Sequence, residues 1–238
     1  MAGHSLGEYT ALAAVGAFTL SDAARLLKTR GRAMQAAVPV GEGAMSALLG
    51  AEIAWAEAAA REAVEAALPG EKNPVCVVAN DNAPGQVVIS GSKAAVERAG
   101  EIAKAKGAKR AMALAVSAPF HCPLMQPAAD AMRAALAEVT IRPPAAPVVA
   151  NVTAAEVSEP ETIRRLLVEQ VTGRVRWRES VLAFRPLGVD TTVEAGGGKV
   201  LTGMVKRIDK ELQTVTLDTP ADIEAFARTY IEAFARTL

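Results

Sequence analysis

The 238-residue sequence predicts an α/β fold in which a small βαββαβ unit is inserted into a larger subdomain with a parallel sheet. Two observations carry this prediction. Short apolar runs of strand length alternate with longer segments of helical periodicity along the chain. The pattern also changes within 43–116, where strands lie close together around a turn rich in Asn, Pro and Gly. We expect the large subdomain to comprise residues 1–42 and 117–238, and the small subdomain residues 43–116.

Two helices are expected in the first 42 residues. An amphipathic stretch runs from about Glu8 to Ala14 and stops near Gly16. Ser21 followed by Asp22 is typical of a helix start, and apolar residues at helical spacing extend this second helix to about Ala37.

Within 43–116 the expected order of elements is strand, helix, strand, strand, helix, strand, which is the ferredoxin-like unit. Asn80–Gly85 is the turn signal between the two central strands. The expected strands are Gly43–Gly50, Val75–Ala79, Gln86–Ser90 and Lys109–Val116, and the expected helices are Ile53–Ala67 and Lys93 to about Lys106.

The remaining residues predict a return to alternating elements. Gly196–Gly198 is read as a turn, since a phosphate-binding loop would need glycine at 193 and Ser or Thr at 200. The tail carries Ile-Glu-Ala-Phe-Ala-Arg-Thr twice, at 223–229 and 231–237, and is expected to be a terminal helix. Helices are expected at Pro123–Val139, Glu161–Gln170, from about Arg178, and at Lys199–Lys210, and strands at Pro147–Asn151 and Thr191–Ala195.

Composition excludes several classes of function. Lys plus Arg and Asp plus Glu both total 26, so no overall field recruits nucleic acid or an anionic membrane. Two cysteines and two histidines fit no disulfide framework and no zinc-site spacing. The sequence contains no apolar run long enough to span a membrane and no signal-peptide core. We therefore expect a cytoplasmic protein with free thiols.

The best candidate for a nucleophile is Ser5, in Gly3-His4-Ser5-Leu6-Gly7. This pattern matches G-x-S-x-G, a sharp strand-to-helix turn that exposes a serine hydroxyl at a helix N-terminus. The helix dipole and backbone N–H groups there favour the negative charge that develops on an attacked carbonyl. The pentapeptide is common by chance, and an ordinary glycine turn is an equally good interpretation of it alone.

A serine nucleophile needs a base, and the chain has only two histidines. His4 adjoins Ser5 inside the turn, where successive side chains diverge, so His4 is a poor candidate for the base. The remaining candidate is His121, although a structural loop histidine is the alternative. No histidine follows it, so the chain order differs from that of α/β-hydrolases, in which an acid and then a histidine follow the serine. The base is therefore expected in another topology, with or without a carboxylate partner.

Arg30 falls on the apolar stripe of the second predicted helix, at helical spacing from Leu26, Leu27 and Met34. A guanidinium is seldom buried unpaired, because its desolvation costs several kcal/mol. Its planar fork suits a carboxylate. A substrate carboxylate is one candidate partner; an internal acidic side chain, or a path to solvent, is the other.

Several segments together resemble the malonyl-CoA:acyl-carrier-protein transacylase family over nearly the whole chain. The first is Gly3-His4-Ser5-Leu6-Gly7-Glu8-Tyr9, which is similar to the family's nucleophile segment. The others are Asn82 to Gly91, Ser117-Ala118-Pro119-Phe120-His121, Gln170 to Trp177, and Glu194 to Leu201. The resemblance implies a large α/β-hydrolase-like subdomain with an inserted ferredoxin-like one.

The resemblance also implies roles for seven residues. Ser5 attacks the malonyl thioester, and His121 is its base, held by the backbone carbonyl of Gln170. Arg30 binds the malonyl carboxylate, and the Leu6 N–H supplies half of the oxyanion hole. Asn82 lies near the cleft, where it bonds substrate or serves the turn, and Phe120 disfavours a 2-methyl branch.

The implied reaction needs no cofactor, because malonyl-CoA is a substrate and phosphopantetheine is carried by the partner. That partner is an acyl-carrier protein in fatty-acid biosynthesis, and the transferase is expected to be a monomer. A local basic docking face is conceivable, although solvated surface charge explains its residues as well. These are Arg174, Arg176, Arg178, Lys199, Lys206 and Arg207.

The sequence departs from the family at its start, where only Met1 and Ala2 precede the turn. Family members carry several dozen more residues there, including a Gly-Gln-Gly-Ser-Gln segment that donates the second oxyanion N–H. The resemblance thus implies a chain without the family's N-terminal segment. Two alternatives to an active acyltransferase stay open: an inactive remnant, and a patatin-type serine hydrolase that pairs its serine with an aspartate.

Overall fold

The structure is a computed structural model that describes residues 1–235, with side chains described to residue 229. Contacts divide the chain into two compact units, Met1–Ser180 and Val181–Leu238. All the predicted site residues belong to the first unit.

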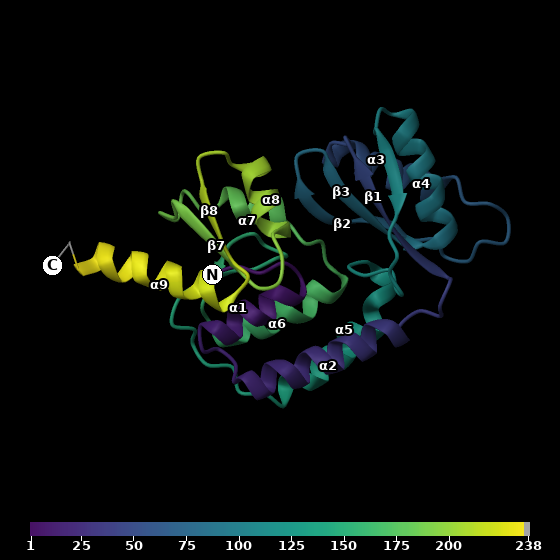
Figure 1. The fold of residues 1–238 in the computed structure, drawn as a ribbon. Coiled ribbons are helices and arrows are strands. Elements are labelled where there is room, and N and C mark those ends of the chain that lie inside the picture. The colour runs from purple at the N-terminus through teal and green to yellow at the C-terminus, as the bar shows by residue number, and fades with distance from the viewer. Residues whose placement is uncertain (236–238) are drawn as a thin grey trace. The chain divides into compact units, whose positions relative to one another are not determined.

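Four helices form the main core of the first unit: α1 (Leu6–Ala14), α2 (Leu20–Ala36), α5 (Gln126–Ala137) and α6 (Pro160–Thr172). The α2 and α5 helices pack along each other, and α5 packs on α6 (Figure 1). Thr19, two residues before the predicted start, caps α2 by accepting a hydrogen bond from the Asp22 N–H. The apolar faces meet in a core that includes Leu12, Leu26, Met132, Leu136 and Leu167.

The βαββαβ order is confirmed. The sheet has the order β2-β3-β1-β4, and every neighbouring pair is antiparallel. Helices α3 and α4 contact each other and the sheet, and small Ala side chains let them approach it closely (Figure 1). The elements are β1 (Gly43–Leu49), α3 (Ile53–Glu65), β2 (Cys76–Ala83), β3 (Gln86–Ser92), α4 (Lys93–Ala105) and β4 (Arg110–Ala113).

The turn prediction at Asn80–Gly85 was wrong in extent, because β2 continues to Ala83 and only Pro84 and Gly85 form the loop. The pairing with β3 shifts register twice, between Val78 and Asn80 and again between Asp81 and Ala83. Such bulges allow residues with poor strand propensity to remain in the ladder. The other edge of β2 is also occupied, since the Asp81 N–H donates to the Val175 carbonyl.

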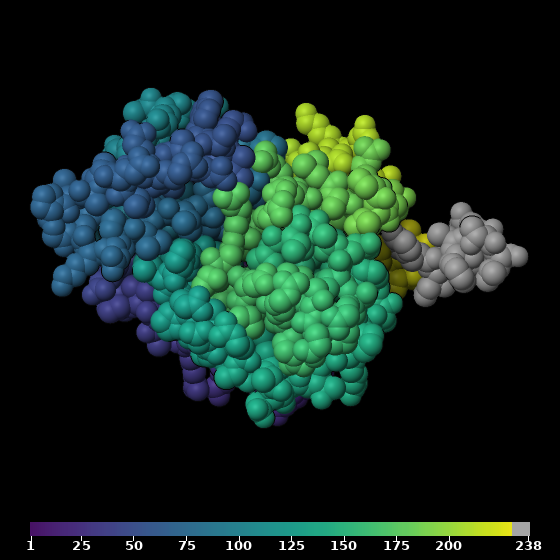
Figure 2. Space-filling view, turned by 180° about the vertical axis from the view of Figure 1, so that it is seen from behind, coloured from purple at the N-terminus to yellow at the C-terminus, as the bar shows by residue number. Residues whose placement is uncertain are grey.

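A short parallel contact places the N-terminus beside the middle of the chain. Ala2 bridges to Val149, at the end of β5 (Val148–Val149), and the Val149 N–H donates to the Met1 carbonyl at 2.9 Å. The β5 strand also pairs with β6 (Glu156–Val157), which the sequence did not predict. The 3₁₀ turn η1 (Pro123–Met125) leads into α5. Figure 2 shows the blue atoms of the small sheet and its helices beside the teal and green atoms of α5 and α6.

The second unit contains a parallel pair of strands, β7 (Thr191–Ala195) and β8 (Gln213–Leu217), joined through α8 (Val200–Ile208). The β7 strand was predicted, whereas β8 was missed. The α7 helix (Trp177–Leu182) crosses the boundary between the units, and α9 (Pro220–Ala235) begins in the tail as expected. The last residues of the second tail repeat lie outside the described residues. Among residues 1–235, no helix has the length and apolarity needed to cross a membrane.

Candidate active site

Ser5 lies in a strained turn between the Ala2 bridge and α1, with φ 52° and ψ −104°. A non-glycine residue at positive φ is uncommon and indicates a conformation that the surroundings enforce. Gly3 makes the turn possible, because a Cβ atom at that position would lie 1.9 Å from the Gly7 carbonyl oxygen. The turn into a helix that G-x-S-x-G predicts is therefore present, although a single bridge at Ala2 stands where the pattern predicts a strand.

The His121 ring lies against the serine hydroxyl. Its Nε2 atom is 2.7 Å from Ser5 Oγ, and its Nδ1 atom is 2.8 Å from the Gln170 carbonyl oxygen. A carbonyl oxygen only accepts, so Nδ1 carries the proton and the neutral ring presents a bare Nε2 to the Ser5 hydroxyl. The geometry thus makes Ser5 Oγ the donor and His121 the acceptor.

His121 is fully buried, and burial together with the nearby Arg30 charge lowers its pKa from 6.5 to about 3. Desolvation disfavours the imidazolium, and a cation adds to that effect. The ring is therefore neutral at ordinary pH and always ready to accept a proton. It is also a weaker base than a histidine paired with a carboxylate.

Arg30 projects from α2 into the same site and is only 6% exposed. Its Nη2 atom donates to Ser5 Oγ at 2.9 Å and to Gln170 Oε1 at 3.0 Å, and its guanidinium lies 5.8 Å from the centre of the Tyr9 ring. Within the described part of the chain, Arg30 makes no ion pair, and its Nε has no hydrogen-bond partner. The internal acidic partner considered above is thus not found in direct contact.

The Gln170 side chain connects the arginine to a buried carboxylate. Its Nε2 donates to the Ser5 carbonyl at 2.9 Å and to Glu8 Oε2 at 2.8 Å, while its Oε1 accepts from Arg30. Burial raises the pKa of Glu8 from 4.5 to about 7, against the opposing effects of its hydrogen bonds and of Arg30. The site thus contains an arginine and a carboxylate separated by one amide.

Three further predicted residues complete the set, and two of them lie at the turn. Leu6 is the first residue of α1, a position whose N–H has no partner within the helix. Asn82 is buried on β2, and its Oδ1 lies 2.8 Å from His4 Nε2. Phe120 is half-buried and packs against the core at the segment that ends in His121. All seven predicted site residues therefore lie in one unit.

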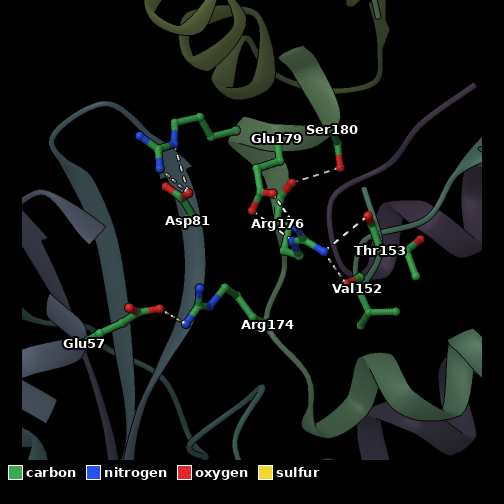
Figure 3. Close-up of polar contacts among 9 residues, drawn as sticks. Glu57, Asp81, Val152, Thr153, Arg174, Arg176, Glu179 and Ser180 are labelled. Atoms are coloured by element: carbon green, nitrogen blue, oxygen red, sulfur yellow. Dashed lines mark hydrogen bonds and ion pairs between the residues drawn. The ribbon is translucent and has the colours of Figure 1, made fainter. Parts of the chain in front are cut away.

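The arginines of 174–178 do not form a free basic surface. Arg174 pairs with Glu57 at 2.6 Å, Arg178 with Asp81 at 2.9 Å, and Arg176 with Glu179 (Figure 3). Arg174 and Arg176 also line, together with His121, a pocket of about 460 Å³. Because each cation has a carboxylate partner, these three side chains contribute little net positive potential for docking.

Sequence reasoning missed two buried residues of the site, Glu8 and Asn151. Glu8 stands in the quoted nucleophile segment, and a glutamate facing the core of a helix is itself a signal, since unpaired carboxylates are seldom buried. Asn151 ends the predicted strand at 147–151, and the carboxyl ends of parallel strands commonly carry functional side chains. Groups of three or more His, Cys, Asp or Glu side chains able to hold a metal ion are not found among the described residues.

Comparison with known proteins assigns the chain to a family. The acyl transferase domain model matches residues 1–220. The malonyl CoA-acyl carrier protein transacylase of Salmonella typhimurium is 47% identical over 225 residues, which is 94% of this chain and 71% of the relative. The enzyme of the same name from Bacillus subtilis is 44% identical over 231 residues, 97% of this chain and 71% of the relative.

Solved structures agree with the sequence matches. The acyl-carrier-protein-S-malonyltransferase of Bartonella henselae superposes with a TM-score of 0.90 at 53% identity, over 96% of this chain and 70% of the other. A malonyl-transacylase solved in complex with its type II polyketide acyl-carrier protein gives a TM-score of 0.88 at 44% identity, over 93% and 70%. The predicted fold class, a large α/β-hydrolase-like subdomain with a ferredoxin-like one, is thereby confirmed. The chain belongs to the malonyl-CoA:acyl-carrier-protein transacylase family.

Proposed function

We propose that this chain transfers a malonyl group from malonyl-CoA to the phosphopantetheine thiol of an acyl-carrier protein, through a malonyl ester of Ser5, in fatty-acid biosynthesis. One observation carries the proposal. Ser5 Oγ lies within hydrogen-bond distance of a neutral His121 Nε2 on one side and of the buried Arg30 guanidinium on the other. A nucleophile, its base and a binding group for a carboxylate thus meet at one oxygen atom.

Acylation begins when His121 Nε2 takes the proton of Ser5 Oγ as that oxygen attacks the thioester carbonyl. The new C–O bond forms as the C–S bond breaks, and His121 returns the proton to the departing coenzyme A thiolate. The N–H of Leu6, at the start of α1, stabilises the negative charge on the carbonyl oxygen. The Gln170 carbonyl keeps the imidazole in the required tautomer throughout.

Transfer to the carrier repeats these steps in reverse. The phosphopantetheine thiol gives its proton to His121 Nε2 and attacks the malonyl ester, and Ser5 leaves with the proton. A thiol is far more acidic than water, so a base whose pKa is about 3 discriminates in favour of the thiol. The use of a backbone carbonyl in place of a carboxylate partner for His121 therefore suits a transferase better than a hydrolase.

Arg30 selects the acyl group. Its Nε is buried without a partner in the described residues, and a buried unsatisfied donor costs roughly 1–3 kcal/mol. The malonyl carboxylate supplies the missing acceptor and a compensating charge. Asn82 and Phe120 bound the acyl pocket, where Phe120 restricts space for a branch at C2.

We propose the partners and surroundings of this reaction as well. The acceptor is an acyl-carrier protein, no bound cofactor takes part, and the enzyme acts as a cytoplasmic monomer without nucleic acid or membrane. The inserted subdomain spans residues 43–116, between 1–42 and 117–238 of the large one.

The test is intact-protein mass spectrometry of this chain after incubation with malonyl-CoA. We expect the mass of one malonyl group on the wild-type chain, none on Ser5→Ala, and strongly reduced labelling on His121→Ala. Adding an acyl-carrier protein with its phosphopantetheine arm should remove the adduct and place it on the carrier. Discharge to water at the same rate with and without the carrier would refute transfer, and full labelling of His121→Ala would favour the patatin-type hydrolase.

A further inference from the structure

We propose that Asn151 is a positioning residue for the reaction, which holds the Ser5 turn in its reactive conformation by bonding the backbone on both sides of His4. The inference deepens the proposed function, because it concerns how the same nucleophile is kept in place. Asn151 is not assigned a role by the catalytic scheme above.

The two ends of the Asn151 amide both bond to the backbone of the turn. Its Oδ1 accepts from the Ser5 N–H at 2.7 Å, and its Nδ2 donates to the Gly3 carbonyl at 2.7 Å. A side-chain amide is neutral and offers an acceptor and a donor side by side. Asn151 therefore completes a ring that includes the residues from Gly3 to Ser5.

The backbone of Asn151 is itself held by hydrogen bonds. Its N–H donates to Glu8 Oε2 at 3.1 Å, and the carbonyl accepts from the Arg176 N–H at 2.9 Å. Two residues earlier, the Val149 N–H bonds to the Met1 carbonyl at 2.9 Å, which fixes the strand end beside the start of the turn. With only 1% of its surface exposed, Asn151 has little freedom to adopt another rotamer.

The turn needs such support because its conformation is unfavourable by itself. Ser5 has φ 52° and ψ −104°, a conformation that a non-glycine residue adopts only when the surroundings enforce it. Relaxation of the turn would move Oγ away from His121 Nε2. Since a displacement of about 1 Å at a reacting atom can cost about 100-fold in rate, the constraint has a direct kinetic consequence.

The experiment compares Asn151→Asp and Asn151→Ala with the wild type and with Asn73→Asp, a matched control at an exposed loop asparagine. The aspartate keeps an acceptor for the Ser5 N–H but has no donor for the Gly3 carbonyl. Two rates are measured: malonylation of Ser5 over a range of malonyl-CoA concentrations, and labelling of Ser5 by an uncharged fluorophosphonate. The second probe does not depend on recognition of malonate, so it separates this inference from the proposed function. Thermal melting establishes whether each variant is folded.

If Asn151 positions the nucleophile, both variants lose roughly 10- to 100-fold in the saturating malonylation rate and a similar factor in fluorophosphonate labelling. The half-saturating malonyl-CoA concentration stays within about threefold, because Arg30 is untouched, and Asn73→Asp matches the wild type. A folded Asn151 variant that keeps both rates, or a loss confined to substrate affinity, overturns the inference. So does failure of both variants to fold, which would make Asn151 a folding determinant. A wild-type chain that accepts fluorophosphonate but not malonate refutes the proposed function alone, and one that accepts neither refutes both.

Discussion

Replacing Glu8 by glutamine should change how the stability of the protein depends on pH. The pKa of Glu8 is raised from 4.5 to about 7 by burial. Since one pKa unit corresponds to about 1.4 kcal/mol, ionisation of Glu8 costs about 3 kcal/mol more in the folded chain than in the unfolded one. The glutamine side chain of the variant keeps the size of the group and a carbonyl that can accept from Asn151 and Gln170, but it does not titrate.

The direction in which stability changes with pH follows from proton binding. A raised pKa means that the folded chain holds this proton more tightly, so the stabilising contribution is present below about pH 4.5 and is lost as the pH rises through about 7. The titration of Glu8 thus lowers the free energy of unfolding by about 2.5 kcal/mol as the pH rises from about 5 to about 8. The pKa of His121 is lowered from 6.5 to about 3, so the contribution of His121 is lost as the pH falls below 6.5. That loss amounts to about 2 kcal/mol from about pH 8 to about pH 5.

In the wild type these two contributions nearly cancel, whereas Glu8→Gln leaves only that of the histidine. This difference can be measured as the free energy of unfolding, by urea titration at several pH values between about 5 and 8. We expect the difference between wild type and Glu8→Gln to shift by about 2.5 kcal/mol in favour of the variant as the pH rises. Glu65→Gln, an exposed change on α3, is the control and should show no such shift. Parallel curves for wild type and Glu8→Gln would refute the reasoning.

Three further predictions follow from the same geometry. Gly3→Ala should abolish fluorophosphonate labelling and lower the melting temperature, because the added Cβ would lie 1.9 Å from the Gly7 carbonyl oxygen; Gly31→Ala, within α2 and with open space around its Cβ, should instead stabilise by about 1 kcal/mol. Equal melting temperatures of the two variants would contradict this. Arg30→Lys should lower kcat/KM for malonyl-CoA roughly 30-fold, a loss of about 2 kcal/mol of transition-state stabilisation, because lysine lacks the planar fork of the guanidinium. An unchanged kcat/KM in steady-state assays would show that the malonyl carboxylate binds elsewhere. Labelling of Glu8→Gln by fluorophosphonate should stay level from about pH 8 to about pH 5, since His121 remains neutral there, and a fall centred near its ordinary value of 6.5 would mean that the histidine is accessible to water.

The local sequence pattern was sufficient to predict an element where that element buries one face and has clear ends. The βαββαβ order was predictable because alternating strands and alanine-rich helices have distinct periods, and because Gly85 marks the hairpin loop. The Gly3 to Gly7 pattern likewise predicted the nucleophile turn, since its conformation depends on residues that are adjacent in the chain. Arg30 was conspicuous because a cation on an apolar stripe needs a partner.

Elements that depend on distant partners were predicted poorly. The extension of β2 through Asn80, Asp81 and Asn82 results from pairing with β3 and with Val175, and neither partner influences the local propensity. The β8 strand was missed for a similar reason, since its partner β7 is separated from it in the sequence by α8. The carboxylate partners of Arg174 and Arg178 come from α3 and β2, far away in the sequence, and are equally invisible in a local pattern. The partner of Arg176 is Glu179, only three residues further along the chain.

The sequence by itself therefore determined which residues to propose for the chemistry: a serine in a turn, one available histidine and an arginine on the apolar face of a helix. Only the tertiary structure decided how they act together. It brings Ser5, Arg30 and His121 to one oxygen atom across 116 residues of sequence, and it buries Glu8, Asn151 and Gln170 around them. The physical reason is that hydrogen bonding and pKa depend on distance and desolvation, which the order of residues does not specify.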